Sequence, residues 1–316
     1  MTEVVSLNDV WKFYGKNQVL KEINFKVKKG ELLVLLGSNG SGKTTLLRLI
    51  STLSNPDKGF IRLFGTQIEN NKKSIRRDIG MLFDQPIHWE HLSGYQNAWF
   101  FARSHGLSKQ IAESRLNYLF KWINLQEKKN DLVKTYSYGM KRKLALIETL
   151  SHQPKILLLD EPSMGLDYTS RLSLFDLLKS IIKSGSTIIL ATNDVNEAAL
   201  LAHKVLLLRK GNIVAFGEPK KLMNSLNSMV KFNLKLVFPI PLSPIKEIEG
   251  VKGVEIETSK DNEFKMIILT NPKSIKEIPL ILAKIFNKIV EIGGFLSSFE
   301  VKNPNLGDLF LKLKGD

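Results

Sequence analysis

The stretch GSNGSGKTT, residues 37–45, constrains the fold of this chain more than any other feature of its sequence. It has the spacing Gly-x4-Gly-Lys-Thr, it follows the apolar segment ELLVLL, and it precedes the helix-like segment TTLLRLIST. Glycines let backbone N–H groups close around phosphate oxygens, and the positive end of a helix dipole lies at the same place. The sequence therefore predicts a strand, a phosphate-binding loop and a helix in an α/β domain.

The loop supplies the candidate phosphate ligands, which are Gly37, Ser38, Asn39, Gly40, Ser41, Gly42, Lys43, Thr44 and Thr45. Lys43 can neutralise the β and γ oxygens of a nucleotide triphosphate, and the Thr44 hydroxyl can ligate Mg²⁺. A chance glycine-rich turn is the alternative, but the strand before the loop and the helix after it argue against a chance match.

A second chemical element follows at KILLLDEP, which places two carboxylates at the carboxyl end of an apolar strand. Ligands bind at this edge of α/β sheets. We expect Asp160 to hold the Mg²⁺ shell and Glu161 to polarise the attacking water as general base. Two acids at a strand end are often only solvated, but a phosphate-binding loop earlier in the chain favours the catalytic interpretation.

The rest of the chain suggests two domains. Residues 1–215 alternate short apolar strands with helical stretches, which is typical of βαβ units. Within them, a helical subdomain at about 94–145 interrupts the alternation. Its apolar residues have helical spacing, and we expect them to pack between helices; they include Trp99, Ala102, Ile111, Leu116, Leu119 and Trp122.

The segment 221–316 is expected to form a small α+β domain, separate from a first domain at 1–220. KFNLKLVF alternates as a strand does, VKGVEIETSKDNEFKMIILT suggests a hairpin, and GGFLSSFEV a further strand. An amphipathic helix with an N-cap at Ser274 and a short terminal helix in NLGDLFLKL complete this prediction.

Composition excludes several classes of protein. The absence of cysteine excludes disulfides and cysteine-ligated metals and suits a reducing compartment. No apolar run reaches the ~18 residues of a membrane helix, and we expect no signal peptide. The net charge of +15 permits nucleic acid, an anionic membrane or only solubility. Because the lysines are scattered, a solvated surface is the default and no nucleic acid is expected.

Five motifs in order resemble those of the nucleotide-binding subunit of an ATP-binding cassette (ABC) transporter: GSNGSGKTT, GMLFDQP, TYSYGMKRKLAL, KILLLDEP and SMGLD. The resemblance covers residues 3 to about 220, and the remainder resembles the C-terminal extension of many ATPases of the ABC-2 branch. It implies an α/β P-loop NTPase fold with a helical subdomain and a small α+β C-terminal domain. ATP and Mg²⁺ are the cofactors that it implies.

The resemblance also assigns roles to single residues. Gln85 matches the Q-loop glutamine, which in the family contacts Mg²⁺ or the water and faces the permease. Asp167 matches the D-loop aspartate. Tyr14 matches the aromatic residue that stacks on adenine, although a tyrosine of the core or of a turn explains it nearly as well. The signature motif, which in the family closes the ATP site of another subunit, corresponds to Ser137, Tyr138, Gly139 and Met140.

Asn193 departs from the family pattern, because it occupies the position of the switch histidine that contacts the γ-phosphate. An amide donates a hydrogen bond but carries no positive charge, so we expect transition-state stabilisation to be weaker by about 1–3 kcal/mol. We favour a slow ATPase over a subunit whose partner supplies the better site. The five histidines lie outside this position and are expected to be surface or structural.

The resemblance implies a motor ATPase that pairs with a second copy or another ABC subunit and drives a separate transmembrane permease. The ABC-2 branch indicates export, with the chain peripheral on the cytoplasmic face of the cell membrane. Candidate permease contacts are His88, Trp89 and His91, and ordinary packing explains Trp89 equally well. The alternatives are a non-hydrolysing regulatory clamp and, less favoured, an ATPase acting on nucleic acid.

Overall fold

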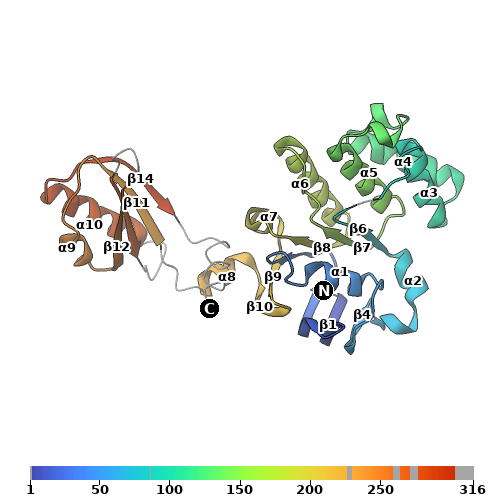
Figure 1. Ribbon diagram of the computed structural model, residues 1–316, viewed down its shortest axis with the longest axis horizontal. Helices are drawn as coiled ribbons and strands as arrows, with labels where there is room; N and C mark the ends of the chain where they lie inside the picture. Colours follow the sequence, from blue (N-terminus) through green and yellow to red (C-terminus); the bar gives the residue numbers. More distant parts are fainter. Residues whose placement is uncertain (1, 86, 226–229, 259–263, 271–276, 303–316) are drawn as a thin grey trace. The chain divides into compact units, whose positions relative to one another are not determined.

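The computed structural model describes residues 2–85, 87–225, 230–258, 264–270 and 277–302. Contacts divide the chain into two units, Met1–Pro219 and Lys220–Asp316, and each has its own hydrophobic core (Figure 1). Among the helices of these described residues, none combines the length and the apolar character that crossing a bilayer requires.

The first unit contains an antiparallel sheet with the order β2-β1-β4-β5. Its strands are β1 (Glu3–Tyr14), β2 (Asn17–Lys28), β4 (Lys58–Leu63) and β5 (Thr66–Gln67). Residues 3–28 thus form a hairpin, which differs from the alternation of strands and helices that we expected there. The reason lies in the pattern of β2, NQVLKEINFKVK, whose alternating burial is that of an antiparallel strand with one exposed face.

A second sheet of the same unit has the order β10-β9-β3-β8-β7-β6. Its five strands from β9 to β6 run parallel, and β10 pairs with β9 antiparallel. The apolar runs are fully buried in β3, β7 and β8, as predicted. The strands are β3 (Leu32–Leu36), β6 (Ile79–Leu82), β7 (Ile156–Asp160), β8 (Thr187–Thr192), β9 (Lys204–Arg209) and β10 (Asn212–Gly217).

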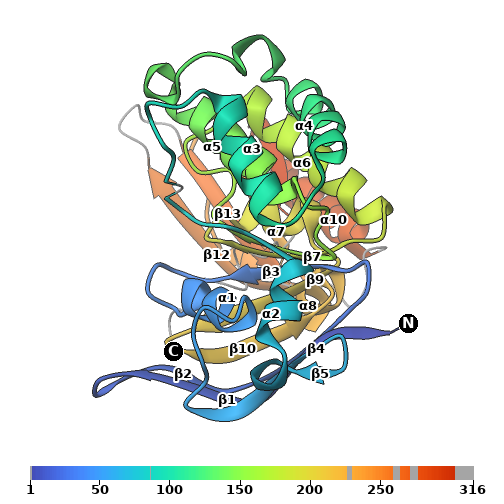
Figure 2. The same cartoon turned by 90° about the vertical axis from the view of Figure 1, so that its right-hand side faces the viewer.

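Helices surround the parallel sheet. Helix α1 packs against β7 and β8 and also touches β2, while α7 packs against β3. Figure 2 shows the antiparallel sheet on one side of the parallel sheet and helices α3, α4 and α5 on the other. The helices of this unit are α1 (Lys43–Ile50), α2 (Lys72–Arg77), α3 (Gly94–Ser104), α4 (Lys109–Trp122), α5 (Tyr138–Leu150), α6 (Tyr168–Lys183) and α7 (Val195–Leu201).

Helices α3, α4 and α5 are neighbours, and serine side chains cap all three at their amino ends. Ala102, Leu116 and Leu119 are buried as expected. The expectation is wrong for Ile111 and Trp122, which are 60% and 37% exposed. Helical spacing places residues on one face, but it does not say whether another element covers the whole of that face.

The second unit has the order βαββαβ, with the sheet order β12-β13-β11-β14, which is the arrangement of the ferredoxin-like motif. The predicted strands and amphipathic helix are present, and Phe232, Met266 and Ile285 lie in the core between them. Ser274 and the predicted terminal helix lie outside the described residues. The elements are β11 (Val230–Leu236), α9 (Ser243–Lys246), β12 (Val251–Thr258), β13 (Phe264–Thr270), α10 (Ile278–Glu291) and β14 (Leu296–Lys302), preceded by α8 (Pro219–Ser225).

Candidate active site

Three loops meet at the carboxyl edge of the parallel sheet. Leu36 at the end of β3 pairs with Thr192 at the end of β8, and Asp160 at the end of β7 pairs with Ala191 of β8. The phosphate-binding loop, the carboxylate pair and Asn193 follow these strand ends directly. The parallel register therefore brings together motifs that are more than 100 residues apart in the chain.

The phosphate-binding loop needs glycine at its two ends. A Cβ atom on Gly37 would lie 2.5 Å from the carbonyl oxygen of Leu208, and Gly42 has a φ of +108° where it caps α1. Between them, Ser38, Asn39 and Gly40 are exposed. The Ser41 hydroxyl is buried without a hydrogen-bond partner, and Thr44 and Thr45 are half-buried at the start of α1.

Lys43 points back across this loop. Its ammonium group donates to the carbonyl oxygens of Gly37, at 2.8 Å, and Ser38, at 3.3 Å, and it lies 3.7 Å from Oε1 of Glu161. Burial lowers the pKa of Lys43, and the carboxylates of Glu161 and Asp160 oppose that shift. A buried cation held by two carbonyls of this loop is well placed for anionic phosphate oxygens.

The surroundings of the Asp160 side chain indicate whether the site suits Mg²⁺. Its side chain is 1% exposed, and its Oδ2 atom has no hydrogen-bond partner. Burial raises the pKa of Asp160, and a hydrogen bond with Thr44 opposes the shift. Mg²⁺ takes one or two carboxylates or hydroxyls and fills its other positions with water and phosphate. An orphaned carboxylate oxygen beside a threonine hydroxyl therefore fits this ion.

Glu161 is held by the neighbouring strand. Its backbone N–H donates to the carbonyl of Ala191 at 2.9 Å, and its carboxylate accepts a hydrogen bond from the backbone N–H of Asn193. It has a φ of +46°, an uncommon conformation for a residue other than glycine. Burial raises the pKa of Glu161 against the effect of Lys43, which moves the carboxylate toward the range that suits a general base.

Asn193 is joined to the phosphate-binding loop, since its Nδ2 atom lies 3.5 Å from Oδ1 of Asn39. Gln85 follows β6, and its side chain is exposed. Among the residues that the structure describes, no recorded contact joins Gln85 to Thr44 or Asp160. The structure thus brings together the loop, the carboxylate pair and Asn193, but not Gln85.

Tyr14 and the signature and D-loop residues lie on exposed parts of the unit. Tyr14 ends β1 at the hairpin turn and is 46% exposed, which excludes a tyrosine of the core. Ser137 caps α5 by accepting the N–H of Met140, with Tyr138 exposed and Gly139 half-buried in its first turn. Asp167 caps α6 by accepting the N–H of Ser170 at 2.8 Å.

The segment predicted to meet a permease requires a correction. The side chain of His88 is only 2% exposed, because it lies between Glu148, at 3.1 Å, and the carbonyl of Lys141, at 3.0 Å. His88 is therefore not a surface contact. Trp89 is 45% exposed, although its ring packs 4.6 Å from that of Phe100.

Sequence reasoning missed the most exposed apolar residue of this segment, Ile87, which is 90% exposed. It lines a groove of about 680 Å³ together with Leu53, Phe83, Gln85 and Phe101. The sequence DQPIHWEHLSG held one sign of this exposure, because Ile87 belongs to no run of apolar residues with the spacing of a strand or a helix.

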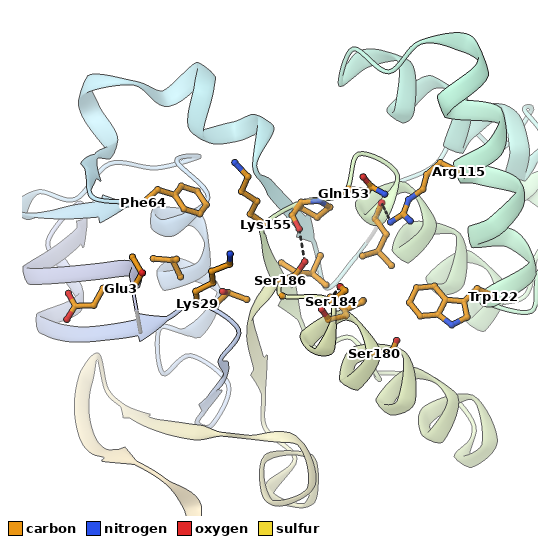
Figure 3. Close-up of a pocket in the computed structure, with 18 of the residues that line it drawn as sticks. Glu3, Lys29, Phe64, Arg115, Trp122, Gln153, Lys155, Ser180, Ser184 and Ser186 are labelled. Carbon is orange, nitrogen blue, oxygen red and sulfur yellow. Dashed lines mark hydrogen bonds between the residues drawn. The ribbon is translucent and has the colours of Figure 1, made fainter.

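A cavity of about 960 Å³ lies at the opposite edge of the sheet, where Lys155 precedes β7 and Ser186 precedes β8 (Figure 3). Arg115 and Trp122 form its other wall. None of the predicted site residues lines it. The candidate active site is therefore the carboxyl edge, and not this cavity.

Comparisons with known proteins agree with this geometry. The family model described as ABC transporter matches residues 20–164. The chain is 28% identical over 314 residues to the linearmycin resistance ATP-binding protein LnrL of Bacillus subtilis, covering 99% of this chain and 98% of that protein. It is 34% identical over 213 residues to the uncharacterized ABC transporter ATP-binding protein YdbJ of the same organism, covering 67% and 68%.

Solved structures give the same fold. A dimeric ATP-binding cassette in a post-hydrolysis state, bound to ADP and Pi, superposes with a TM-score of 0.63 at 26% identity. The match covers 68% of this chain and 98% of that one. The α/β P-loop architecture predicted from the sequence is thereby confirmed, with the additional C-terminal strands of the second unit.

Proposed function

We propose that this chain, which belongs to the ABC transporter ATP-binding proteins, hydrolyses ATP to drive a separate transmembrane permease. The chain is an ATPase of this family. The observation that carries the proposal is the assembly at the carboxyl edge of the sheet. There Lys43 lies 3.7 Å from Oε1 of Glu161, and Oδ2 of the preceding residue, Asp160, is buried without a hydrogen-bond partner.

The chemistry follows from these residues. Loop 37–45 binds the phosphates through its N–H groups, and Lys43 neutralises the β and γ oxygens. Glu161 takes the proton of the attacking water. Thr44 and Asp160 would hold Mg²⁺, and Gln85 would have to move toward them to serve as a further oxygen ligand. The ion would shield the charge of the phosphates. Asn193 donates one neutral hydrogen bond where the family has a histidine.

We infer that two copies of the chain complete each other's sites. Ser137 and Tyr138 are exposed at the N-terminus of α5, beside the half-buried Gly139, and the N-terminus of a helix attracts a γ-phosphate. Exposure of the signature residues supports a nucleotide bound between the loop of one copy and the Ser137 turn of its partner. ATP then joins the copies, and hydrolysis releases them.

We further infer export, with the chain peripheral on the cytoplasmic face of the membrane. The full-length similarity to a resistance protein supports this direction of transport. The groove that Ile87 lines is the proposed site for the permease, because it also holds the exposed apolar side chains of Leu53 and Phe83. Trp89 does not line the groove, but its ring packs 5.8 Å from that of Phe101, which does. The ferredoxin-like unit is proposed to stabilise the pair or regulate it.

The proposed function is tested with Glu161→Gln. Wild-type protein should release phosphate with MgATP, and the variant should bind ATP, release at least a hundredfold less phosphate and accumulate as an ATP-dependent dimer in light scattering. Asp176→Asn, which changes an exposed acid on α6, is the matched control and should behave as wild type. A variant that stays monomeric with ATP contradicts the proposed pair.

A regulatory clamp that does not hydrolyse ATP is the second candidate, since two neutral amides meet at Asn193 and Asn39. It predicts ATP-dependent dimers of the wild type without phosphate release. Phosphate release that disappears in Glu161→Gln dismisses it.

A further inference from the structure

Arg142 is the largest fully buried side chain of the described residues, with 1% of its surface exposed. It lies in the second turn of α5, and each hydrogen bond of its guanidinium ends at a backbone carbonyl. Nη1 donates to Phe83 at 2.6 Å and Asp84 at 2.7 Å, Nη2 donates to Asp160 at 2.7 Å and to Glu161, and Nε donates to Pro162 at 3.3 Å.

Only arginine satisfies this set of acceptors. A guanidinium has five N–H donors in one plane, and here five carbonyls accept them, whereas a lysine ammonium has three donors at a single point. A buried charge is costly unless it is fully hydrogen-bonded. No carboxylate forms an ion pair with Arg142 within the described part of the chain, so the carbonyls offset that cost.

The acceptors belong to two motifs of the active site. Phe83 and Asp84 begin the segment that carries Gln85, and Asp160 and Glu161 are the proposed magnesium ligand and general base. His88 ties the first of these segments to α5 a second time, because its Nε2 atom donates to the carbonyl of Lys141 at 3.0 Å. Helix α5 is thus bonded to both motifs.

The start of α5 serves the other site under the proposed function. Ser137, five residues before Arg142, is the residue that contacts the partner's nucleotide in a pair. A helix is a rigid element, and the planar guanidinium binds its acceptors in a fixed geometry. A shift of α5 therefore moves the carbonyls of Glu161 and Asp84 in the same copy.

We propose that Arg142 is a positioning residue that couples the two ATP sites of a pair. Nucleotide bound at the Ser137 turn displaces α5, and Arg142 carries this displacement to the backbone of Glu161 and to the Gln85 segment. The coupling of sites rests on the proposed function, whereas the attachment of residues 83–88 to α5 does not.

The experiment compares full-length Arg142→Lys and Arg142→Gln with the control Arg115→Gln. Arg115 is also a largely buried guanidinium, but it donates to the carbonyl of Leu150 outside both motifs (Figure 3). Phosphate release is measured against ATP concentration, MgATP binding is measured by calorimetry, and hydrogen–deuterium exchange is measured for peptides spanning 80–91 without nucleotide.

We expect cooperative hydrolysis in the wild type, with a Hill coefficient well above 1. Both Arg142 variants should lower kcat at least tenfold and bring the Hill coefficient to 1, while the Kd for MgATP changes less than threefold. Their peptides 80–91 should exchange faster. The Arg115→Gln protein should match the wild type in all three measurements.

Unchanged kcat and Hill coefficient in folded Arg142 variants overturn the coupling, and so does non-cooperative hydrolysis by the wild type. Equal losses of MgATP affinity and of kcat reveal a merely structural arginine. If the wild type neither dimerises nor hydrolyses ATP, the proposed function fails instead. The attachment of residues 83–88 to α5 is then tested on its own, and it is overturned if peptides 80–91 of the Arg142 variants exchange as in the wild type. Should neither variant fold, His88→Gln, which loosens the same segment, must show a lower Hill coefficient.

Discussion

The Nδ2 atom of Asn193 lies 3.5 Å from Oδ1 of Asn39, so the end of β8 meets the phosphate-binding loop through two uncharged amides. The same residue donates its backbone N–H to the carboxylate of Glu161. Its backbone therefore positions the proposed general base, and its side chain is proposed to offer the γ-phosphate one neutral donor. A substitution that keeps the backbone and changes only the side chain separates these two contributions.

We expect Asn193→His to raise kcat for ATP hydrolysis about tenfold, which corresponds to ~1.4 kcal/mol of transition-state stabilisation. An imidazolium donates a charge-assisted hydrogen bond to phosphate that an amide cannot. Steady-state phosphate release measures the effect, and Asn196→His, at the second residue of α7, is the control. No rise in turnover would contradict the view that this asparagine limits the rate.

His152 predicts a pH dependence of stability. Burial lowers the pKa of His152 to about 4, and the stacked ring of His105 adds to the shift. Between pH 6.5 and about 4 the unfolded chain binds a proton that the folded chain does not, so the free energy of unfolding falls as the pH falls. By a pH of about 4, the free energy of unfolding has fallen by about 3 kcal/mol through this one group.

We expect His152→Gln to lose less stability than the wild type over this pH range, because an amide can still donate to the carbonyl of Ile79 and does not titrate. Urea unfolding at pH 7 and pH 4.5 measures the two slopes. Glu148 and Asp160, whose pKa burial raises, are present in both proteins and cancel in the comparison. Parallel pH profiles would argue against a buried neutral His152.

Local patterns in the sequence predicted the elements that carry the site. The apolar runs of β3, β7 and β8 are fully buried, and the glycine loop and the carboxylate pair follow the strands at which we expected them. These features depend on residues adjacent in the chain, so a sequence shows them directly. The roles carried over from family motifs, such as those of Tyr14 and Asp167, remain predictions.

The sequence did not predict which residues far apart in the chain contact one another. Arg142 binds carbonyls that lie 18 to 59 residues away, and His88 lies beside a glutamate 60 residues away. A polar residue in an apolar helix face gives no sign of which distant backbone it meets. The exposure of Ile111 has the same origin, because the spacing within one helix does not reveal what covers it.

The groove beside Ile87 predicts a specific loss of permease binding. Ile87→Asp and Trp89→Asp should each abolish co-purification with the permease, because a carboxylate cannot be buried in an apolar contact without large cost. ATP binding should stay within twofold of the wild type. Ile111→Asp introduces the same charge at a 60% exposed site on α4 and should co-purify normally. Normal co-purification of both groove variants would rule out docking there.

Asp160→Asn should reduce phosphate release at least a hundredfold and weaken binding of MgATP more than binding of ATP in EDTA. The amide replaces a carboxylate oxygen that has no hydrogen-bond partner, so little else in the site changes. Calorimetry with and without Mg²⁺ separates the two affinities, with Asp78→Asn as the control for loss of an acid elsewhere in the sheet region. Equal weakening in both conditions would place Mg²⁺ on other residues.

Truncation after Pro219 tests the ferredoxin-like unit. The first unit keeps its own buried core, which supports folding of the shortened chain, and its active-site residues all precede the cut. If the second unit stabilises the pair, the truncated Glu161→Gln protein should need at least tenfold more protein to reach half-dimerisation with ATP than the full-length variant. Nucleotide affinity, which depends on the first unit, should stay constant and serves as the internal control. An unchanged dimerisation midpoint in light scattering would count against a role in pairing and leave regulation as the function proposed for this unit.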